Sequence, residues 1–279
     1  MCEWVAVTRD WRFVTPAKAK RRARLAFRVI LIALFLASMN LRAQEQQVRV
    51  AAAADLKVAM EELSAEFASK TGAKVDVTNG SSGNFFAQIR SGAPFDLFFS
   101  ADMDYPKKLQ SAGFAEPGTL YEYALGRIVI WTPASTEVDV SQQGWKALLD
   151  PRIQEIAIAN PELAPYGRAA ISALQKAGIY GQVKKKLVYG ENISQAAQFV
   201  QSGNAQAGII ALSLARSPGM RAGKLWEIPA DMHPPVEQGA MVLKTAKNKS
   251  TALAFLNFVR SAAGRTILEK QGFAVPSSN

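Results

Sequence analysis

The alternation of β-rich runs with helical patterns constrains the fold of this chain more than any other feature. From residue 48 onward, short apolar runs rich in β-branched residues alternate with segments of helical periodicity. They occupy residues 48–52, 56–70, 73–78, 85–91 and 96–101. Such alternation is typical of βαβ units built around largely parallel sheets. The sequence therefore predicts an α/β fold.

The helix predicted over 56–70 has clear boundaries. Its apolar residues recur on one helical face, namely Leu56, Met60, Leu63 and Phe67. Asp55 stands directly before it and is a suitable N-cap, and Gly72 follows where a left-handed residue often ends a helix. We expect the Asp55 carboxylate to cap this helix.

The alternation begins again in the second half of the chain. The runs there are 127–131, 156–159, 167–176, 186–189, 194–201 and 207–212. Three prolines (Pro229, Pro234, Pro235) then mark an irregular crossing, followed by a predicted strand at 240–243 and one or two helices in 249–270, broken near Gly264. We expect a first lobe from 44–125, a second lobe from 126–229, and a return to the first lobe over 230–279.

Residues 1–43 have the pattern of a cleavable secretory signal peptide. A cluster of Lys and Arg residues precedes the apolar run 29–37, which is shorter than the roughly 20 residues of a transmembrane helix. We expect cleavage after Ala43 and export to the periplasm; an uncleaved membrane anchor is the alternative. The single cysteine, Cys2, lies in this leader, so the mature chain has neither a disulfide nor a thiolate metal site.

The positive charge of the chain is concentrated in the same leader. The whole chain has a formal net charge of +10. From residue 44 onward, 24 Lys and Arg residues stand against 21 Asp and Glu residues, which leaves a net charge of about +3. There is no basic stripe interleaved with aromatic residues. The sequence therefore predicts a protein that does not bind nucleic acid.

Catalytic motifs are scarce. His233 is the only histidine, and the run 80–83 (Gly-Ser-Ser-Gly) lacks the spacing of a nucleophile elbow. The sequence contains no phosphate-binding loop, dinucleotide fingerprint or metal-ligand spacing. We expect no enzymatic activity and no cofactor. A small hydrolase that uses Ser81 or Ser82, and a sensor or scaffold domain that binds no ligand, remain as alternatives.

Four loops of small or polar residues lead directly into predicted helices. They are residues 53–55, 80–84, 164–167 and 191–194. A helix start offers unpaired N–H groups and the positive end of a dipole, and such loops gather at the carboxyl ends of strands. Two loops come from each predicted lobe. The sequence therefore predicts an interlobe cleft that surrounds one anion with neutral donors.

Several segments together resemble a known family. They are 50–56 (VAAAADL), 80–83 (GSSG), 92–102 (GAPFDLFFSAD) and 164–167 (APYG). They resemble the periplasmic molybdate-binding proteins of molybdate ABC transporters, and the likeness extends from about 48 to 273. It implies a two-lobed periplasmic-binding-protein fold of type II, each lobe a mixed, mostly parallel sheet flanked by helices, with the ligand cleft between lobes.

The same resemblance implies the function. A protein of this kind binds molybdate, and we expect tungstate as well, and delivers it as a monomer to a membrane permease with its ATPase. The anion is held by backbone amides and hydroxyls, with no metal directly coordinated. The implied ligand shell is Ala54, Asp55, Ser82, Tyr166 and Ile193. A binder of another tetrahedral oxyanion, such as sulfate or phosphate, is the alternative.

The roles within this shell differ. The resemblance implies that Ser82 donates its hydroxyl and its N–H, Ile193 its N–H, and Tyr166 its amide and its phenol. Many relatives carry Ser or Asn at the position of Asp55. Because an ionised carboxylate would repel the anion, we expect Asp55 either to turn away as a helix cap or to be protonated. Some relatives place a ligating tyrosine at Ala211, and here we expect Tyr166 to fill that space.

Overall fold

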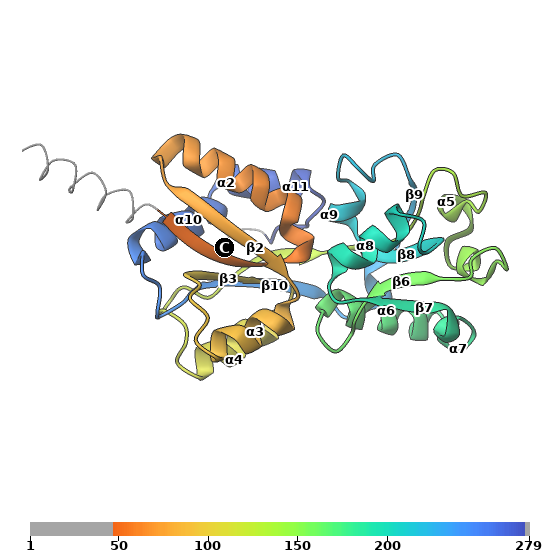
Figure 1. The fold of residues 1–279 in the computed structure, drawn as a ribbon, viewed down its shortest axis with the longest axis horizontal. Helices are drawn as coiled ribbons and strands as arrows, with labels where there is room; N and C mark the ends of the chain where they lie inside the picture. Colours follow the sequence, from red (N-terminus) through yellow and green to blue (C-terminus); the bar gives the residue numbers. More distant parts are fainter. Residues whose placement is uncertain (1–46, 277–279) are drawn as a thin grey trace, which may run out of the picture. The chain divides into compact units, whose positions relative to one another are not determined.

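The computed structural model describes residues 47–276, which form two lobes, each built on a five-stranded sheet (Figure 1). The predicted signal peptide at 1–43, its cleavage after Ala43, and Cys2 lie outside the described residues. Within 47–276, no helix has the length and apolar character needed to cross a membrane.

The first sheet has the strand order β2-β1-β3-β10-β4. Its strands are β1 (Gln47–Ala53), β2 (Lys74–Gly80), β3 (Leu97–Ser100), β4 (Tyr121–Gly126) and β10 (Val236–Val242). Strand β1 pairs in parallel with β2 and β3, whereas β10 runs antiparallel to β3 and β4. Because β10 follows the whole second sheet in sequence, the chain crosses back to complete the first lobe.

Helices cover both faces of this sheet (Figure 1). One face carries α2 (Lys57–Thr71), α10 (Lys249–Arg260) and α11 (Ala262–Lys270), and the other carries α3 (Ser82–Arg90) and α4 (Asp104–Ser111). Each face has its own apolar core: Leu63 and Phe255 belong to the first, and Phe85 and Leu109 to the second.

The second sheet has the order β7-β6-β8-β5-β9. Its strands are β5 (Ile128–Thr132), β6 (Ile156–Ala159), β7 (Leu187–Gly190), β8 (Ala207–Ala211) and β9 (Lys224–Glu227). Helices α6 (Pro165–Lys176) and α8 (Ile193–Gln201) lie on opposite faces (Figure 1). The short helices are α5 (Val140–Gln143), α7 (Tyr180–Val183) and α9 (Leu212–Ala215), and 3-10 turns include η1 (Ala54–Leu56), η2 (Gly144–Leu149), η3 (Lys184–Lys186) and η4 (Ala230–Met232).

This architecture confirms the predicted two-lobed α/β fold with mixed sheets. In each sheet two strand pairings are parallel and two are antiparallel. Half of the pairings are therefore parallel, whereas the prediction was that most of them would be. The antiparallel pairings all involve β10 in the first sheet and β5 in the second.

Two local predictions differ from the structure. The helix predicted over 56–70 is present as α2 and ends at Gly72 with φ 72°, as expected, but its N-cap position is Leu56 and no side chain caps it. The prediction that Asp55 caps this helix is therefore wrong: Asp55 lies in the turn η1 and is fully buried. The C-terminal helices break at Ser261 rather than near Gly264, because the Ser261 hydroxyl caps α11.

Candidate functional site

The four predicted loops meet at one narrow recess between the two lobes. All five residues of the predicted shell line it: Ala54, Asp55, Ser82, Tyr166 and Ile193. The other lining residues come from the same loops, apart from Ala101, which follows β3 directly. Ala101 was absent from the predicted shell, although its place at the end of a strand in the same sheet was a signal for it.

Strand register explains why the loops converge. Ala53 at the end of β1 pairs with Gly80 at the end of β2, and Ala159 at the end of β6 pairs with Gly190 at the end of β7. Because these pairs are parallel, their carboxyl ends lie at one edge of each sheet, where ligands bind in open α/β folds. Each lobe thus brings two loops to the recess.

Three helix starts line this recess. Ser82 and Ile193 are the first residues of α3 and α8, and Tyr166 is the second residue of α6, after Pro165. The N–H groups of a first helical turn have no acceptor within their own helix, and the helix dipole makes this end positive. The three starts therefore offer donors to an anion without any cationic side chain.

The side chains at two of these starts leave those groups free. The Ser81 hydroxyl accepts from the Asn84 N–H, and the Asn192 side chain accepts from the Gln195 N–H. In both cases the cap bonds to the third residue of the helix and not to the first. The N–H groups of Ser82 and Ile193 are thus left for a ligand.

The hydroxyl oxygen of Ser82 accepts a hydrogen bond from the protein backbone. Its oxygen accepts from the Ala101 N–H at 2.9 Å, and the side chain is buried. Because this bond occupies a lone pair of the oxygen, the hydroxyl hydrogen remains available for an acceptor in the recess.

Asp55 is the unusual member of the site. Its Oδ2 accepts from the Tyr166 hydroxyl at 2.9 Å and from the Gln238 amide at 2.7 Å, whereas its Oδ1 is buried and has no hydrogen-bond partner. Burial raises the pKa of this carboxyl to about 6, although these two donors and the backbone N–H groups of Asp55 and Leu56 act in the opposite direction. The Tyr166 phenol is therefore committed to Asp55, which corrects the expectation that it donates to the anion and leaves the Tyr166 amide for that role.

Three further residues bear on the predictions for this site. Gln238, from β10, is fully buried and was missed by the sequence analysis, because an isolated polar residue in a strand carries no motif. Ala211, where a tyrosine was considered, is buried at the end of β8 and does not line the recess. His233 does not line it either, and its ring contacts the Pro234 carbonyl.

The recess has no positively charged lining residue. Among its lining residues, only Asp55 and Tyr166 carry ionisable side chains. Within 47–276, no cluster of three or more His, Cys, Asp or Glu residues could hold a metal ion. The arrangement suits a compact anion that is bound through its oxygens by neutral donors.

The two lobes are closed on each other around this recess. From the second lobe, the Ser194 hydroxyl donates to the Ala54 carbonyl at 2.9 Å and the Ser213 hydroxyl to the Asp55 carbonyl at 2.8 Å. The Gly83 N–H donates in the other direction, to the Leu163 carbonyl at 3.0 Å. Hydrogen bonds between the lobes thus hold the loops 53–55 and 80–84 of the first lobe against the second lobe.

Gly83→Ala is expected to weaken ligand binding by about threefold to tenfold. A Cβ at this position would lie 2.8 Å from the Leu163 carbonyl oxygen of the second lobe, so it opposes closure of the lobes. It would also lie 2.9 Å from the Tyr105 hydroxyl, which is the far end of a flexible side chain in the same lobe as Gly83. Calorimetric titration measures the affinity, and thermal unfolding without ligand is the control, since neither lobe's own core is changed. An unchanged affinity would show that this contact does not contribute to closure.

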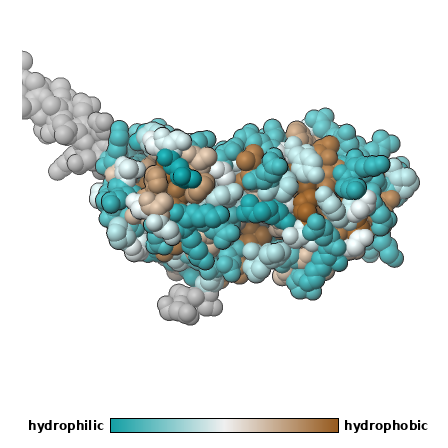
Figure 2. Space-filling view, turned by 90° about the horizontal axis from the view of Figure 1, so that it is seen from below, coloured by the Kyte–Doolittle hydropathy of each residue, from teal (hydrophilic) through white to brown (hydrophobic). Residues whose placement is uncertain are grey.

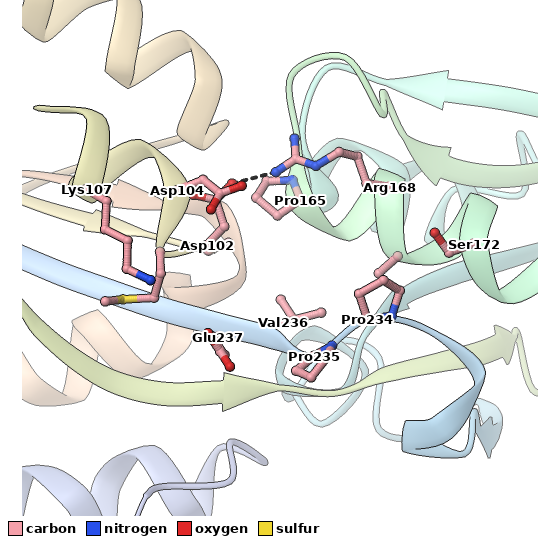
Figure 3. Close-up of a pocket in the computed structure, with 13 residues that line it drawn as sticks. Asp102, Asp104, Lys107, Pro165, Arg168, Ser172, Pro234, Pro235, Val236 and Glu237 are labelled. Carbon is pink, nitrogen blue, oxygen red and sulfur yellow. Dashed lines mark hydrogen bonds and ion pairs between the residues drawn. The ribbon is translucent and has the colours of Figure 1, made fainter.

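A larger cavity of about 320 Å³ lies beside the recess and shares Ala101 and Pro165 with it. Figure 3 shows Arg168 of α6 reaching across to Asp102, with Lys107 and Glu237 on the wall nearby. Its charged lining residues have both signs, which favours ion pairing between the lobes over capture of an anion. The sequence did not predict this cavity.

Comparison with known proteins agrees with this geometry. Residues 48–274 match the model of the bacterial extracellular solute-binding protein family. The chain is 40% identical over 235 residues to the molybdate-binding protein ModA of Rhodobacter capsulatus, covering 84% of this chain and 91% of that protein. The chain belongs to the ModA-type group of bacterial extracellular solute-binding proteins.

Further relatives of this solute-binding protein support the assignment. ModA of Azotobacter vinelandii is 35% identical over 247 residues, which are 88% of this chain and 97% of that protein. The solved structure of the periplasmic molybdate-binding protein of the same organism superposes with a TM-score of 0.78 at 32% identity, covering 82% of this chain and all of that chain. This chain is accordingly a binding protein and not an enzyme.

Proposed function

We propose that this protein captures molybdate, and tungstate with it, in the periplasm and delivers it to an ABC importer made of a permease and an ATPase. The observation that carries the proposal is the convergence of the five shell residues on one recess lined by neutral donors. The names of the relatives support molybdate as the ligand. Molybdate is here the transported solute and not a cofactor.

The mechanism of binding follows from the donors. A buried divalent anion is costly unless its oxygens are hydrogen-bonded, and bonds to ionised acceptors are the strong ones. The amides of Ala54, Asp55, Ser82, Tyr166 and Ile193 and the Ser82 hydroxyl supply such bonds. Selection against sulfate rests on size, because a closed cleft set for longer metal–oxygen bonds leaves sulfate with stretched hydrogen bonds.

A binder of another tetrahedral oxyanion is the alternative, and Asp55 is the residue that favours it. A carboxylate that lines the recess could accept a hydrogen bond from a protonated anion such as hydrogen phosphate. Sulfate, which carries no proton at neutral pH, gains nothing from such an acceptor.

Isothermal calorimetry of the mature chain from Gln44 onward tests the proposal. We expect one-to-one binding of molybdate and tungstate and no heat with sulfate or phosphate under the same conditions. Stronger binding of phosphate than of molybdate would establish the alternative. The absence of binding to all four anions would contradict the proposed function.

Export and assembly belong to the same proposal. We propose that the signal peptide 1–43 is removed, that the lobes are 44–125 with 230–279 and 126–229, and that the mature protein is a monomer. The basic and apolar pattern of the leader supports the first point, and the membership of the two sheets supports the second. The face drawn in Figure 2 is largely hydrophilic, and Leu149 and Tyr189 are the exposed large apolar residues within 47–276, which supports the third point. Intact mass tests removal of the signal peptide, and light scattering tests the monomeric state.

A further inference from the structure

The carboxyl group of Asp55 uses its two oxygens differently. It is fully buried and lines the recess. Oδ2 accepts two hydrogen bonds, from Tyr166 and Gln238, and Oδ1 accepts none. A buried polar atom without a partner is uncommon in proteins and calls for an explanation such as a ligand.

The donors behind Oδ2 are fixed in place. The Tyr123 hydroxyl donates to the Gln238 Oε1 at 2.5 Å, which orients the amide so that its Nε2 faces both Asp55 and the Tyr166 hydroxyl, at 2.7 and 2.9 Å. Because Oδ2 is already occupied by two N–H or O–H donors, a proton on this carboxyl belongs on Oδ1. There it would form an O–H donor for an anion in the recess.

Among the described residues, no cationic side chain is one of the groups that shift the pKa of Asp55. The ionisable groups that face it are the phenols of Tyr166 from α6 and Tyr123 from β4, and burial raises the pKa of both well above the usual value. The cation nearest in sequence to Tyr166 on α6 is Arg168, and its side chain forms an ion pair with Asp102. Asp102 is the second carboxyl group, besides Asp55, that acts on Tyr123. Burial raises the pKa of Asp55 itself to about 6.

The other elements packed against η1 add no charge at this point. Helices α8 and α9 contain no charged residue, and they contribute the hydroxyls of Ser194 and Ser213. On α2, Lys57 is exposed, and the charged residues of β2 lie toward the end of the strand opposite Gly80. On β10 the contact is the neutral Gln238. A divalent anion beside an ionised carboxylate would thus meet unscreened repulsion.

We propose that oxyanion binding in this recess is coupled to the uptake of one proton, which is shared between Oδ1 of Asp55 and an oxygen of the bound anion. The inference rests on the proposed function and adds a donor that the other shell residues do not provide. It makes Asp55 a specificity-determining residue whose protonation state sets the affinity.

The direction of the pH dependence follows from the two states of the carboxyl. The anion favours the protonated form, so the pKa of Asp55 is higher in the complex than in the free protein. Binding is strongest below the free pKa and weakens as pH rises above it, by up to about tenfold per pH unit, until the pKa of the complex is reached. An Asp55 that stays ionised in both states would give no such slope.

Calorimetry with molybdate tests the coupling. The mature chain is titrated at pH 7.5 in buffers of different ionisation enthalpy, and the affinity is followed from pH 6.5 to 8.5. We expect uptake of about one proton and an affinity that falls fivefold to about tenfold per unit of pH. Asp55→Asn, which has nearly the same shape, should bind without proton uptake and with a flat profile.

A second variant distinguishes loss of the titrating group in Asp55→Asn from damage to the structure. Tyr166→Phe removes one donor to Oδ2 and should move the fall in affinity to higher pH, because the ionised form loses a hydrogen bond. Molybdate binding by the unaltered protein without proton uptake, or uptake that persists in Asp55→Asn, would overturn the inference while leaving the proposed function intact. Failure of molybdate and the other tetrahedral oxyanions to bind at any pH would overturn both.

Discussion

Replacing Ser82 with alanine is expected to weaken molybdate binding by about tenfold to a hundredfold, the range for loss of one hydrogen bond to a charged group. The Ser82 oxygen already accepts from the Ala101 N–H, so its hydrogen is the part left for the anion. The backbone N–H of residue 82 stays in place in the variant. Calorimetric titration at one fixed pH gives the ratio of affinities directly.

The neighbouring serine provides a matched control. Ser81→Ala removes the hydroxyl that accepts from the Asn84 N–H at the start of α3, so it should lower the free energy of unfolding by about 1 kcal/mol with little change in affinity. Ser82→Ala also leaves the Ala101 N–H without an acceptor, so both variants lose some stability. If the two variants lost affinity equally, the Ser82 hydroxyl would have no direct role in the shell.

Gly167→Ala is expected to destabilise the protein by about 3 kcal/mol or more, which corresponds to a fall of roughly 6–12 °C in Tm for a protein of this size. A Cβ at this position would lie 2.2 Å from the Ala159 carbonyl oxygen and 2.8 Å from the Pro161 nitrogen. Both are backbone atoms, so neither can rotate away as a side chain would. Calorimetric melting without ligand measures the effect.

The close approach at Gly167 also positions the site. It brings the start of α6, with the Tyr166 amide, against the end of β6. Gly181→Ala is the control, because a Cβ there meets no atom within 4 Å and the residue is helical; its Tm should be unchanged or slightly raised. Equal melting temperatures for the two variants would show that α6 can shift without cost.

The parts of the fold that could be predicted are those with a strong local pattern. The central strands and α2 are bounded by turn residues and show continuous or periodic apolar character. Strands β4 and β9 were missed, and both lie at the edges of their sheets. Their sequences, YEYALG and KLWE, contain no β-branched residue and are only partly buried, so they show neither the apolar run of a central strand nor the alternating valines of the edge strand β2, which was predicted.

The site illustrates the same limit. Its four loops could be found because small residues precede each helix and because the motifs resemble a family. The orientation of the Asp55 side chain could not be predicted from the sequence, because its partners Tyr166 and Gln238 lie 111 and 183 residues away. The local rule for helix capping failed where tertiary donors offered the carboxyl a stronger set of bonds.

The division of the shell between the lobes has a consequence for release. In the shell that we propose, the first lobe supplies the groups of Ala54, Asp55 and Ser82, and the second supplies those of Tyr166 and Ile193. Each lobe is thus one arm of a chelate, and tight binding depends on the high effective concentration of the second arm once the first is engaged. In the transport that we propose, separation of the two arms would leave the ion bound by the donors of one lobe alone, so the transporter need not compete for any single hydrogen bond.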